Sequence, residues 1–173
     1  DDRQVVRYVL IGDKEAIISI LEAENSDPND YDIVHAPEVI GMGEHPTIAL
    51  KKKPRSSISI GYQLLRENKI DGFASAGNTG SMFVGAMYTV KAIAGVIRPG
   101  LASIIPKEKG GIGIILDVGA NADCRPDVLS QFAVLGSLFA ENVYGIQNPK
   151  VGLLNIGEEE EKGNLETQAA YKL

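Results

Sequence analysis

Three glycine-bearing loops contain the residue types that could carry chemistry. Each loop follows a short apolar run and combines glycine with Asn, Asp or Glu, over residues 75–81 (SAGNTGS), 117–124 (DVGANADC) and 155–163 (NIGEEEEKG). Glycine lets the backbone approach a ligand closely. Acids and amides beside it can orient a polar substrate or move a proton. We therefore expect a binding site to be built from these loops.

The first loop has the features of an anion site. Gly77 and Gly80 leave the backbone open, and the N–H groups of Thr79, Gly80 and Ser81 begin a predicted helix. A helix N-terminus presents free donors and a positive dipole to phosphate. We expect these residues to bind phosphate or an oxyanion, with Asn78 assisting catalysis. The alternative is a plain turn with Asn78 or Thr79 as a helix cap.

The other two loops supply further candidates. An Asp or Glu can accept the proton of phosphate, and Asn amides can position an oxygen. The predicted catalytic residues here are Asp117, Asn121, Asn155 and Glu158, and the predicted substrate-binding residues are Gly119, Gly157 and Lys162. The alternatives are a loop-capping acid at Asp117 and a lysine that merely balances an acidic run.

No metal or cofactor is expected. The chain lacks the Gly-Lys-Ser/Thr of a P-loop, and its Cys and His residues lack zinc spacing. We interpret Cys124 as a small buried residue, and His35 and His45 as local hydrogen-bonding groups. A single cysteine fits a reducing cytoplasm.

The elements that must position these loops alternate between strands and helices. Apolar runs predict strands at residues 5–11, 32–35, 72–75, 101–105, 112–117 and 151–155. Helical periodicity predicts helices at 14–23, from 56 or 57 to 68, from 78 or 79 to about 92, at 126–143 and at 165–173. The strands at 101–105 and 112–117 either pair as a hairpin or flank a loop. This alternation favours a mostly parallel sheet whose loops meet at one edge.

Composition limits the class of protein. The chain has 173 residues, 44% hydrophobic and 23% charged, enough for one globular domain. A net charge of −6 disfavours nucleic-acid binding, which needs clustered cations. The longest apolar stretch, 82–97, contains Lys91 and is too short and polar to span a bilayer.

Several long strings together are more specific than any single glycine motif. They include FASAGNTG (73–80), LDVGANADC (116–124), QFAVLGS (131–137), VGLLNIGEEEEKG (151–163), GEHPTIALKKKPRSSI (43–58) and IRPGLASIIP (97–106). In this order they resemble the signature segments of the PlsX family of bacterial fatty acid/phospholipid synthesis proteins. Arg55 and Gly100 depart from the family pattern, outside the three loops.

The resemblance implies an activity, a fold and partners. The implied activity is transfer of an acyl group from acyl carrier protein to inorganic phosphate, giving acyl phosphate for phospholipid synthesis. The implied fold is a three-layer α/β/α arrangement like that of phosphotransacetylases and isopropylmalate dehydrogenases. Family members are homodimers that attach peripherally to membranes. Residues 1–173 are then expected to form a single α/β domain, a fragment without the family's N-terminal strand and C-terminal part.

A basic stretch offers a place for the acidic acyl carrier protein. Lys51, Lys52, Lys53 and Arg55 are expected to dock it, unless they form only a solubilising loop. Two other functions stay open. One is a phosphate acetyl- or butyryltransferase that uses coenzyme A thioesters. The other is a non-catalytic module that binds a phosphorylated ligand or recruits other proteins.

Overall fold

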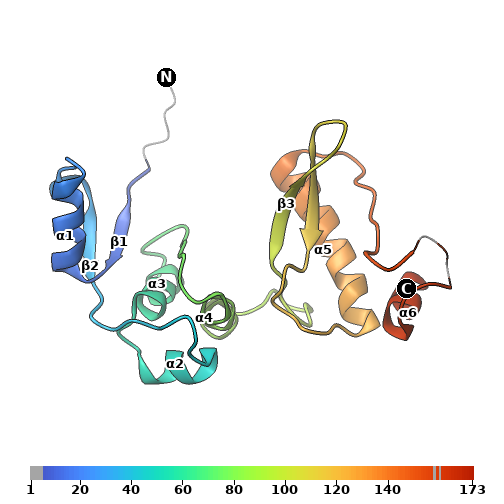
Figure 1. The fold of residues 1–173 in the computed structure, drawn as a ribbon, viewed down its shortest axis with the longest axis horizontal. Coiled ribbons are helices and arrows are strands. Elements are labelled where there is room, and N and C mark those ends of the chain that lie inside the picture. The colour runs from blue at the N-terminus through green and yellow to red at the C-terminus, as the bar shows by residue number, and fades with distance from the viewer. Residues whose placement is uncertain (1–5, 158, 160) are drawn as a thin grey trace. The chain divides into compact units, whose positions relative to one another are not determined.

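The computed structural model describes residues 6–157, 159 and 161–173. It divides into two compact units, Asp1–Lys91 and Ala92–Leu173, here called unit 1 and unit 2 (Figure 1). Each unit combines helices with a small sheet, so the expected α/β class is confirmed. The expectation of a single domain stays a prediction.

Unit 1 begins with a small parallel sheet. Strand β1 (Val9–Gly12) pairs with β2 (Asp32–His35), and helix α1 (Lys14–Ala23) connects them through the short 3-10 turn η1 (Pro28–Asp30). The Asp13 carboxylate accepts a hydrogen bond from the Ala16 N–H at 2.9 Å and so caps α1. The predicted helix at 14–23 and strand at 32–35 are confirmed.

Three further helices complete unit 1. They are α2 (Pro46–Lys52), α3 (Ser57–Arg66) and α4 (Thr79–Gly85), and α4 continues into a π-helical turn, η2 (Ala86–Val90). Ser56 caps α3 and Asn78 caps α4, as predicted. Helix α2 has no counterpart among the predicted helices. Pro46 occupies its first turn, where a missing N–H costs nothing and a fixed φ favours the helix.

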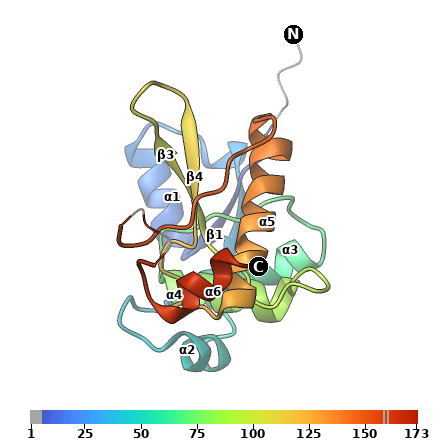
Figure 2. The ribbon, with the colours of Figure 1, turned by 90° about the vertical axis from the view of Figure 1, so that its right-hand side faces the viewer.

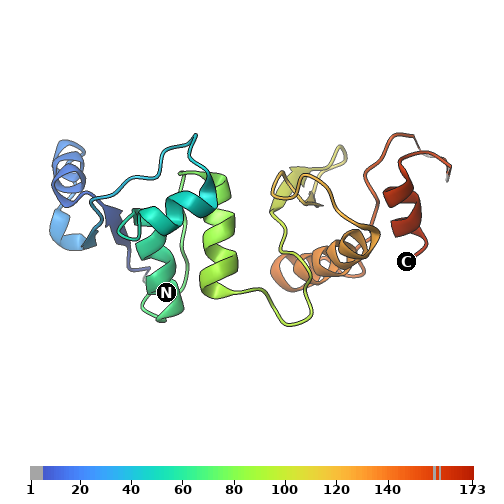
Figure 3. The same cartoon turned by 90° about the horizontal axis from the view of Figure 1, so that it is seen from below.

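Aromatic packing organises the core of unit 1. The core contains Ile40, Ala49, Ile58 and Tyr62, with Phe73 and Met82 packed against it. The rings of Tyr62 and Phe73 meet edge to face with centroids 5.1 Å apart. Figure 3 shows α2, α3 and α4, in teal to green, gathered in this unit.

Unit 2 pairs a hairpin with a long helix. Strands β3 (Ala102–Pro106) and β4 (Ile112–Leu116) are antiparallel, so the hairpin alternative is correct. Helix α5 (Pro126–Tyr144) packs on β4 and ends at Gly145, which has φ 65°. The final helix is α6 (Leu165–Tyr171), which packs on α5 (Figure 2).

Two predicted strands are wrong. Residues 72–75 and 151–155 form no strand, because no neighbouring segment among the described residues pairs with them. The described sheets are two-stranded, one parallel and one antiparallel, where a mostly parallel sheet was expected. Within the described ranges, no helix is long and apolar enough to cross a membrane.

Candidate functional site

Asn78 is buried and its side chain is fully engaged. Its Nδ2 donates to the carbonyls of Gly41, Met42 and Glu44 at 3.1, 3.0 and 3.2 Å. Its Oδ1 accepts from the Ser81 N–H at 2.8 Å, and only 5% of the residue is exposed. Asn78 therefore caps α4 and fastens the 41–44 segment to it, which is the structural alternative foreseen for this residue.

The first loop still offers donors to a ligand. The Gly77 N–H is bonded to Ser75 Oγ at 3.1 Å, and the Ser81 N–H to Asn78. The Thr79 and Gly80 N–H groups have no acceptor among the described residues, as expected for the first turn of a helix. Of the predicted phosphate ligands, Thr79 and Gly80 thus have backbone donors available for binding.

Gly80 also has a packing role. A Cβ atom at this position would lie 2.5 Å from Cγ of Pro46. The start of α4 therefore sits directly on the start of α2. The glycine that leaves the loop open for a ligand is the same one that lets these two helices meet.

Ser81 has a hydroxyl group whose hydrogen-bonding capacity is not used within the described residues. The residue is completely buried, and its Oγ has no hydrogen-bond partner among the described residues. A buried polar group without a partner costs about 1–3 kcal/mol. Ser81 is therefore the side chain of this loop that would gain most from a ligand or another polar group.

In the second loop, Asp117 gathers donors from two directions. Its Oδ1 accepts from the Leu101 N–H at 2.7 Å, and its Oδ2 from the N–H and Nδ2 of Asn121 at 2.7 and 3.0 Å. Asn121 Nδ2 also donates to the Pro99 carbonyl at 3.1 Å. The structure thus brings two predicted catalytic residues together.

The electrostatics of the second loop favour an ionised Asp117. Partial burial alone would raise its pKa, but hydrogen bonds from Leu101 and Asn121 outweigh burial and hold the pKa below its usual value. Burial, followed by the nearby Asp117 charge, raises the pKa of the Cys124 thiol. Cys124 is half-buried, not fully buried as predicted, and its raised pKa disfavours the reactive thiolate.

The third loop is held by Asn155. Its Nδ2 donates to the Lys162 carbonyl at 2.9 Å. Gly157 has φ 80°, a conformation that favours glycine. The Lys162 side chain is exposed, and the predicted catalytic Glu158 lies outside the described residues. The Asn155 side chain thus links the start of the loop to the backbone near its end.

The three loops fall into both units. Residues 75–81 belong to unit 1, and residues 117–124 and 155–163 belong to unit 2. Each loop is described within its own unit, and their convergence on one site stays a prediction. In the part of the chain that the structure describes, no group of three or more His, Cys, Asp or Glu residues could hold a metal.

The basic stretch is only partly available to a partner. Lys51 and Lys52 are exposed in the last turn of α2, and Arg55 is exposed beyond it. Lys53 instead donates to Glu44 Oε1 at 2.5 Å and to the Val39 carbonyl at 2.7 Å. The hydrogen bond from Lys53, followed by that from the Gly41 N–H, lowers the pKa of Glu44. Lys53 thus has a structural role.

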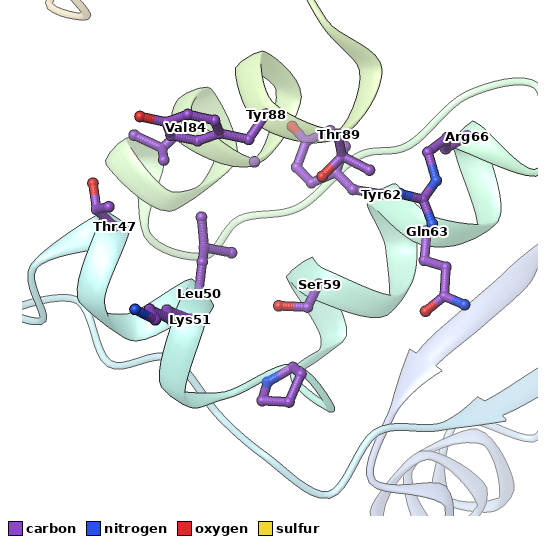
Figure 4. A pocket seen from close by; sticks show the side chains of 12 residues that line it. Thr47, Leu50, Lys51, Ser59, Tyr62, Gln63, Arg66, Val84, Tyr88 and Thr89 are labelled. Atoms are coloured by element: carbon purple, nitrogen blue, oxygen red, sulfur yellow. The ribbon is translucent and has the colours of Figure 1, made fainter.

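A hollow of about 430 Å³ lies beside this stretch, between α2, α3 and α4 (Figure 4). Leu50, Tyr62 and Val84 supply its apolar wall, and Lys51 and Arg66 line it with cations. No sequence motif indicated this hollow, because its residues come from three helices.

The interpretation of the histidines as local hydrogen-bonding groups is supported at His35, whose Nδ1 accepts from the Lys14 N–H at 3.2 Å.

Comparisons with known proteins cover the whole chain. A family model described as "Fatty acid synthesis protein" matches residues 1–173. A phosphate acyltransferase of Desulforamulus reducens is 47% identical over 168 residues, 97% of this chain and 50% of the relative. A phosphate acyltransferase of Dictyoglomus turgidum is 45% identical over 168 residues, again 97% of this chain and 50% of the relative. One from Clostridium tetani is 40% identical over 100% of this chain and 52% of the relative. The chain spans about half the length of the curated relatives it matches.

Proposed function

The chain belongs to the fatty acid synthesis protein family, and on that premise we propose that the full-length protein is a phosphate acyltransferase. The similarity to proteins of that name, 40–47% identity along nearly the whole chain, is the observation that carries the proposal. The acyl donor we propose is the thioester of acyl carrier protein, and the product is acyl phosphate for bacterial phospholipid synthesis.

The reaction needs positioning more than a nucleophilic side chain. An oxygen of phosphate attacks the thioester carbonyl, the carbon–sulfur bond breaks, and the thiolate leaves and takes up a proton. The enzyme must hold an anion, stabilise the oxyanion of the intermediate and align both partners. Backbone N–H groups meet the first two needs without a cofactor.

We assign phosphate binding to the first loop. The free N–H groups of Thr79 and Gly80 point to this role, and the unpartnered hydroxyl of Ser81 adds a further donor. Gly77 allows close approach of the ligand. Asn78 acts as a positioning residue, because its own polar atoms hold the 41–44 segment and the start of α4.

The other loops are proposed to complete the site in the full-length protein. Asp117, ionised and hydrogen-bonded to Asn121, suits a proton acceptor or an orienting acid. Asn155, Glu158, Gly119, Gly157 and Lys162 are assigned to the same site as substrate contacts. This assignment requires the three loops to meet at one edge of a three-layer α/β/α fold.

Acyl carrier protein is proposed to dock at the exposed cations Lys51, Lys52 and Arg55. Attraction between this surface and an acidic partner speeds their encounter and weakens with salt. A homodimer in the cytoplasm with peripheral membrane association completes the proposal, in line with the family resemblance.

The test uses the full-length protein and two acyl donors. Thioesters of acyl carrier protein and of coenzyme A are each incubated with inorganic phosphate, and acyl phosphate is trapped as the hydroxamate. We expect phosphate-dependent product and a preference for the carrier protein as donor. A preference for coenzyme A would support an acetyl- or butyryltransferase instead. Absence of product with either donor, in folded protein, would favour a non-catalytic binding module.

A further inference from the structure

An exposed arginine lies beside the second loop in unit 2. Arg98 precedes β3, and its Nη1 donates to the Asp123 carbonyl at 3.2 Å. Burial chiefly raises the pKa of the Cys124 thiol, and the charge of Arg98 opposes that shift, so the guanidinium lies near the end of the loop. The charged side chains of the loop itself, Asp117 and Asp123, are both acidic. Arg98 therefore brings a positive charge to a loop that has none of its own.

The backbone on the N-terminal side of Arg98 is held by α5. Gln131 of this helix accepts from the Ile97 N–H through Oε1 at 2.8 Å, and its Nε2 donates to the Gly95 carbonyl at 2.9 Å. One side-chain amide thus binds two backbone groups that lie 34 and 36 positions away in the chain. The residue that precedes Arg98 is therefore fastened to α5.

The backbone on the C-terminal side of Arg98 is held by the second loop. Asn121 Nδ2 donates to the Pro99 carbonyl at 3.1 Å. The Leu101 N–H donates to Asp117 Oδ1 at 2.7 Å. Arg98 is thus flanked on both sides by backbone that long-range hydrogen bonds hold in place.

The Arg98 side chain, in contrast, leaves most of its donors unused. The residue is exposed, and a guanidinium has several N–H donors. Among the described residues, its side chain bonds only to the Asp123 carbonyl, and no carboxylate lies within ion-pair distance. Arg125, at the start of α5, is instead paired with Asp127 at 2.7 Å. A cation on a fixed backbone suits ligand binding, because little freedom is lost when the ligand binds.

The second loop needs a cation if a phosphoryl group is to approach it. Asp117 is held in its ionised form, so its charge repels an anion. A guanidinium beside the loop offsets this repulsion. Its planar fork can also donate two parallel N–H bonds to oxygen atoms of one phosphoryl group. The charge and the donor geometry of Arg98 thus fit the same class of ligand.

We propose that Arg98 binds a phosphoryl oxyanion beside loop 117–124. The choice of ligand rests on the proposed function, which brings two phosphoryl groups to the enzyme. One is the inorganic phosphate that attacks, which Arg98 would share with the donors of the first loop. The other is the phosphodiester in the phosphopantetheine arm that carries the acyl thioester on acyl carrier protein. Both present oxygen atoms that a guanidinium can bind.

Chemical footprinting of the unmodified full-length protein tests the proposal without relying on activity. Phenylglyoxal modifies arginine side chains, and peptide mass spectrometry follows its rate at Arg98 and at Arg125, which is exposed in the same unit. We expect a phosphoryl ligand to slow modification of Arg98 several-fold and to leave Arg125 unchanged. The ligands are inorganic phosphate, compared with chloride at equal ionic strength, and acyl carrier protein, compared with its apo form without the arm.

The two ligands distinguish the two sources of the phosphoryl group. Protection of Arg98 by phosphate would assign the attacking ion. Protection by the carrier protein with its arm, beyond that by the apo form, would assign the phosphodiester. Protection by neither phosphate nor the arm would overturn the proposal.

Substitution in the full-length enzyme provides a second readout. Arg98→Gln removes the charge, Arg98→Lys keeps it without the planar fork, and Arg125→Gln is the control. We expect the KM of the ligand that footprinting identifies, phosphate or carrier-protein thioester, to rise about 10-fold or more in the Gln variant. The rise should be smaller in the Lys variant and absent in the control.

The kinetic result also separates this inference from the proposed function. A lower kcat or lower stability of Arg98→Gln, with both KM values unchanged, would show a structural role and would overturn the proposal. Absence of acyl phosphate with the wild-type protein would contradict the proposed function alone, because footprinting with phosphate would still decide the role of Arg98.

Discussion

At the scale of single residues, Asn78 joins segments far apart in the chain. Asn78→Ala removes the α4 cap and three bonds to the carbonyls of Gly41, Met42 and Glu44. We expect a loss of stability of about 2 kcal/mol or more, measured by urea unfolding of the full-length protein. Asn164→Ala in α6 is the matched control, since Asn164 caps Thr167 through one bond and should cost about 1 kcal/mol. Equal losses would show that the bonds to 41–44 contribute nothing.

Asp117 should make the stability of the folded protein depend on pH. Its pKa in the folded protein lies below the ordinary 3.8, so its contribution to stability is present above that value. The contribution is lost as the pH falls through the lower pKa of the folded state. We expect the urea midpoint of unit 2 to fall on acidification below about pH 4. Asp117→Asn should flatten that part of the profile and lower stability at neutral pH by about 2 kcal/mol. An unchanged profile in the variant would assign the acid lability to another group.

The helix caps could be predicted from the sequence, whereas the long-range contacts could not. Asp13, Ser56 and Asn78 stand one residue before an apolar helical pattern, and each accepts the expected bond. Nothing in the sequence around Asn78 indicates its bonds to residues 34–37 positions away. Those bonds depend on how α2 and α4 pack.

At the scale of elements, two glycines differ in the space around them. A Cβ at Gly85 of α4 would lie 2.6 Å from the Tyr62 ring, whereas Gly136 of α5 has open space. Gly85→Ala should destabilise the protein by about 1–2 kcal/mol, because overpacking outweighs the gain in helix propensity. Gly136→Ala should stabilise it by up to about 1 kcal/mol. Thermal or urea unfolding measures both. The same sign of change at the two positions would contradict this account.

Helices were predicted better than strands for a physical reason. The periodicity and caps of α1, α3 and α5 are local, so their bounds could be predicted closely. A strand exists only beside a partner. Residues 72–75 and 151–155 have strand-like sequence, but none of the described residues pairs with them.

At the scale of the whole molecule, charge should govern recognition of the acyl donor. Lys51→Glu with Lys52→Glu reverses the exposed end of α2. We expect the KM for acyl carrier protein thioester to rise several-fold at low salt, with the KM for phosphate unchanged. The same reversals at Lys107 and Lys109, exposed in the β3–β4 turn, serve as the control for net charge. Equal effects from both pairs would argue against a specific docking surface.

The local sequence determines only part of the candidate site. The sequence identified all three loops, and the structure describes the contacts within them, such as the bonds between Asp117 and Asn121. Whether Thr79, Asp117 and Asn155 meet depends on the packing of the two units in the full-length protein. Family membership, in contrast, follows from the sequence along the whole chain.

The most direct test compares two substitutions at Thr79. Thr79→Pro removes the free N–H at the first position of α4, where proline is tolerated, and Thr79→Ala removes the same hydroxyl but keeps the N–H. A bond from this donor to a charged phosphate is worth about 1.5–3 kcal/mol. We therefore predict a phosphate KM at least about 10-fold higher in the proline variant than in the alanine variant of the full-length enzyme. Equal phosphate KM values in two folded, active variants would contradict the assignment of phosphate to this loop.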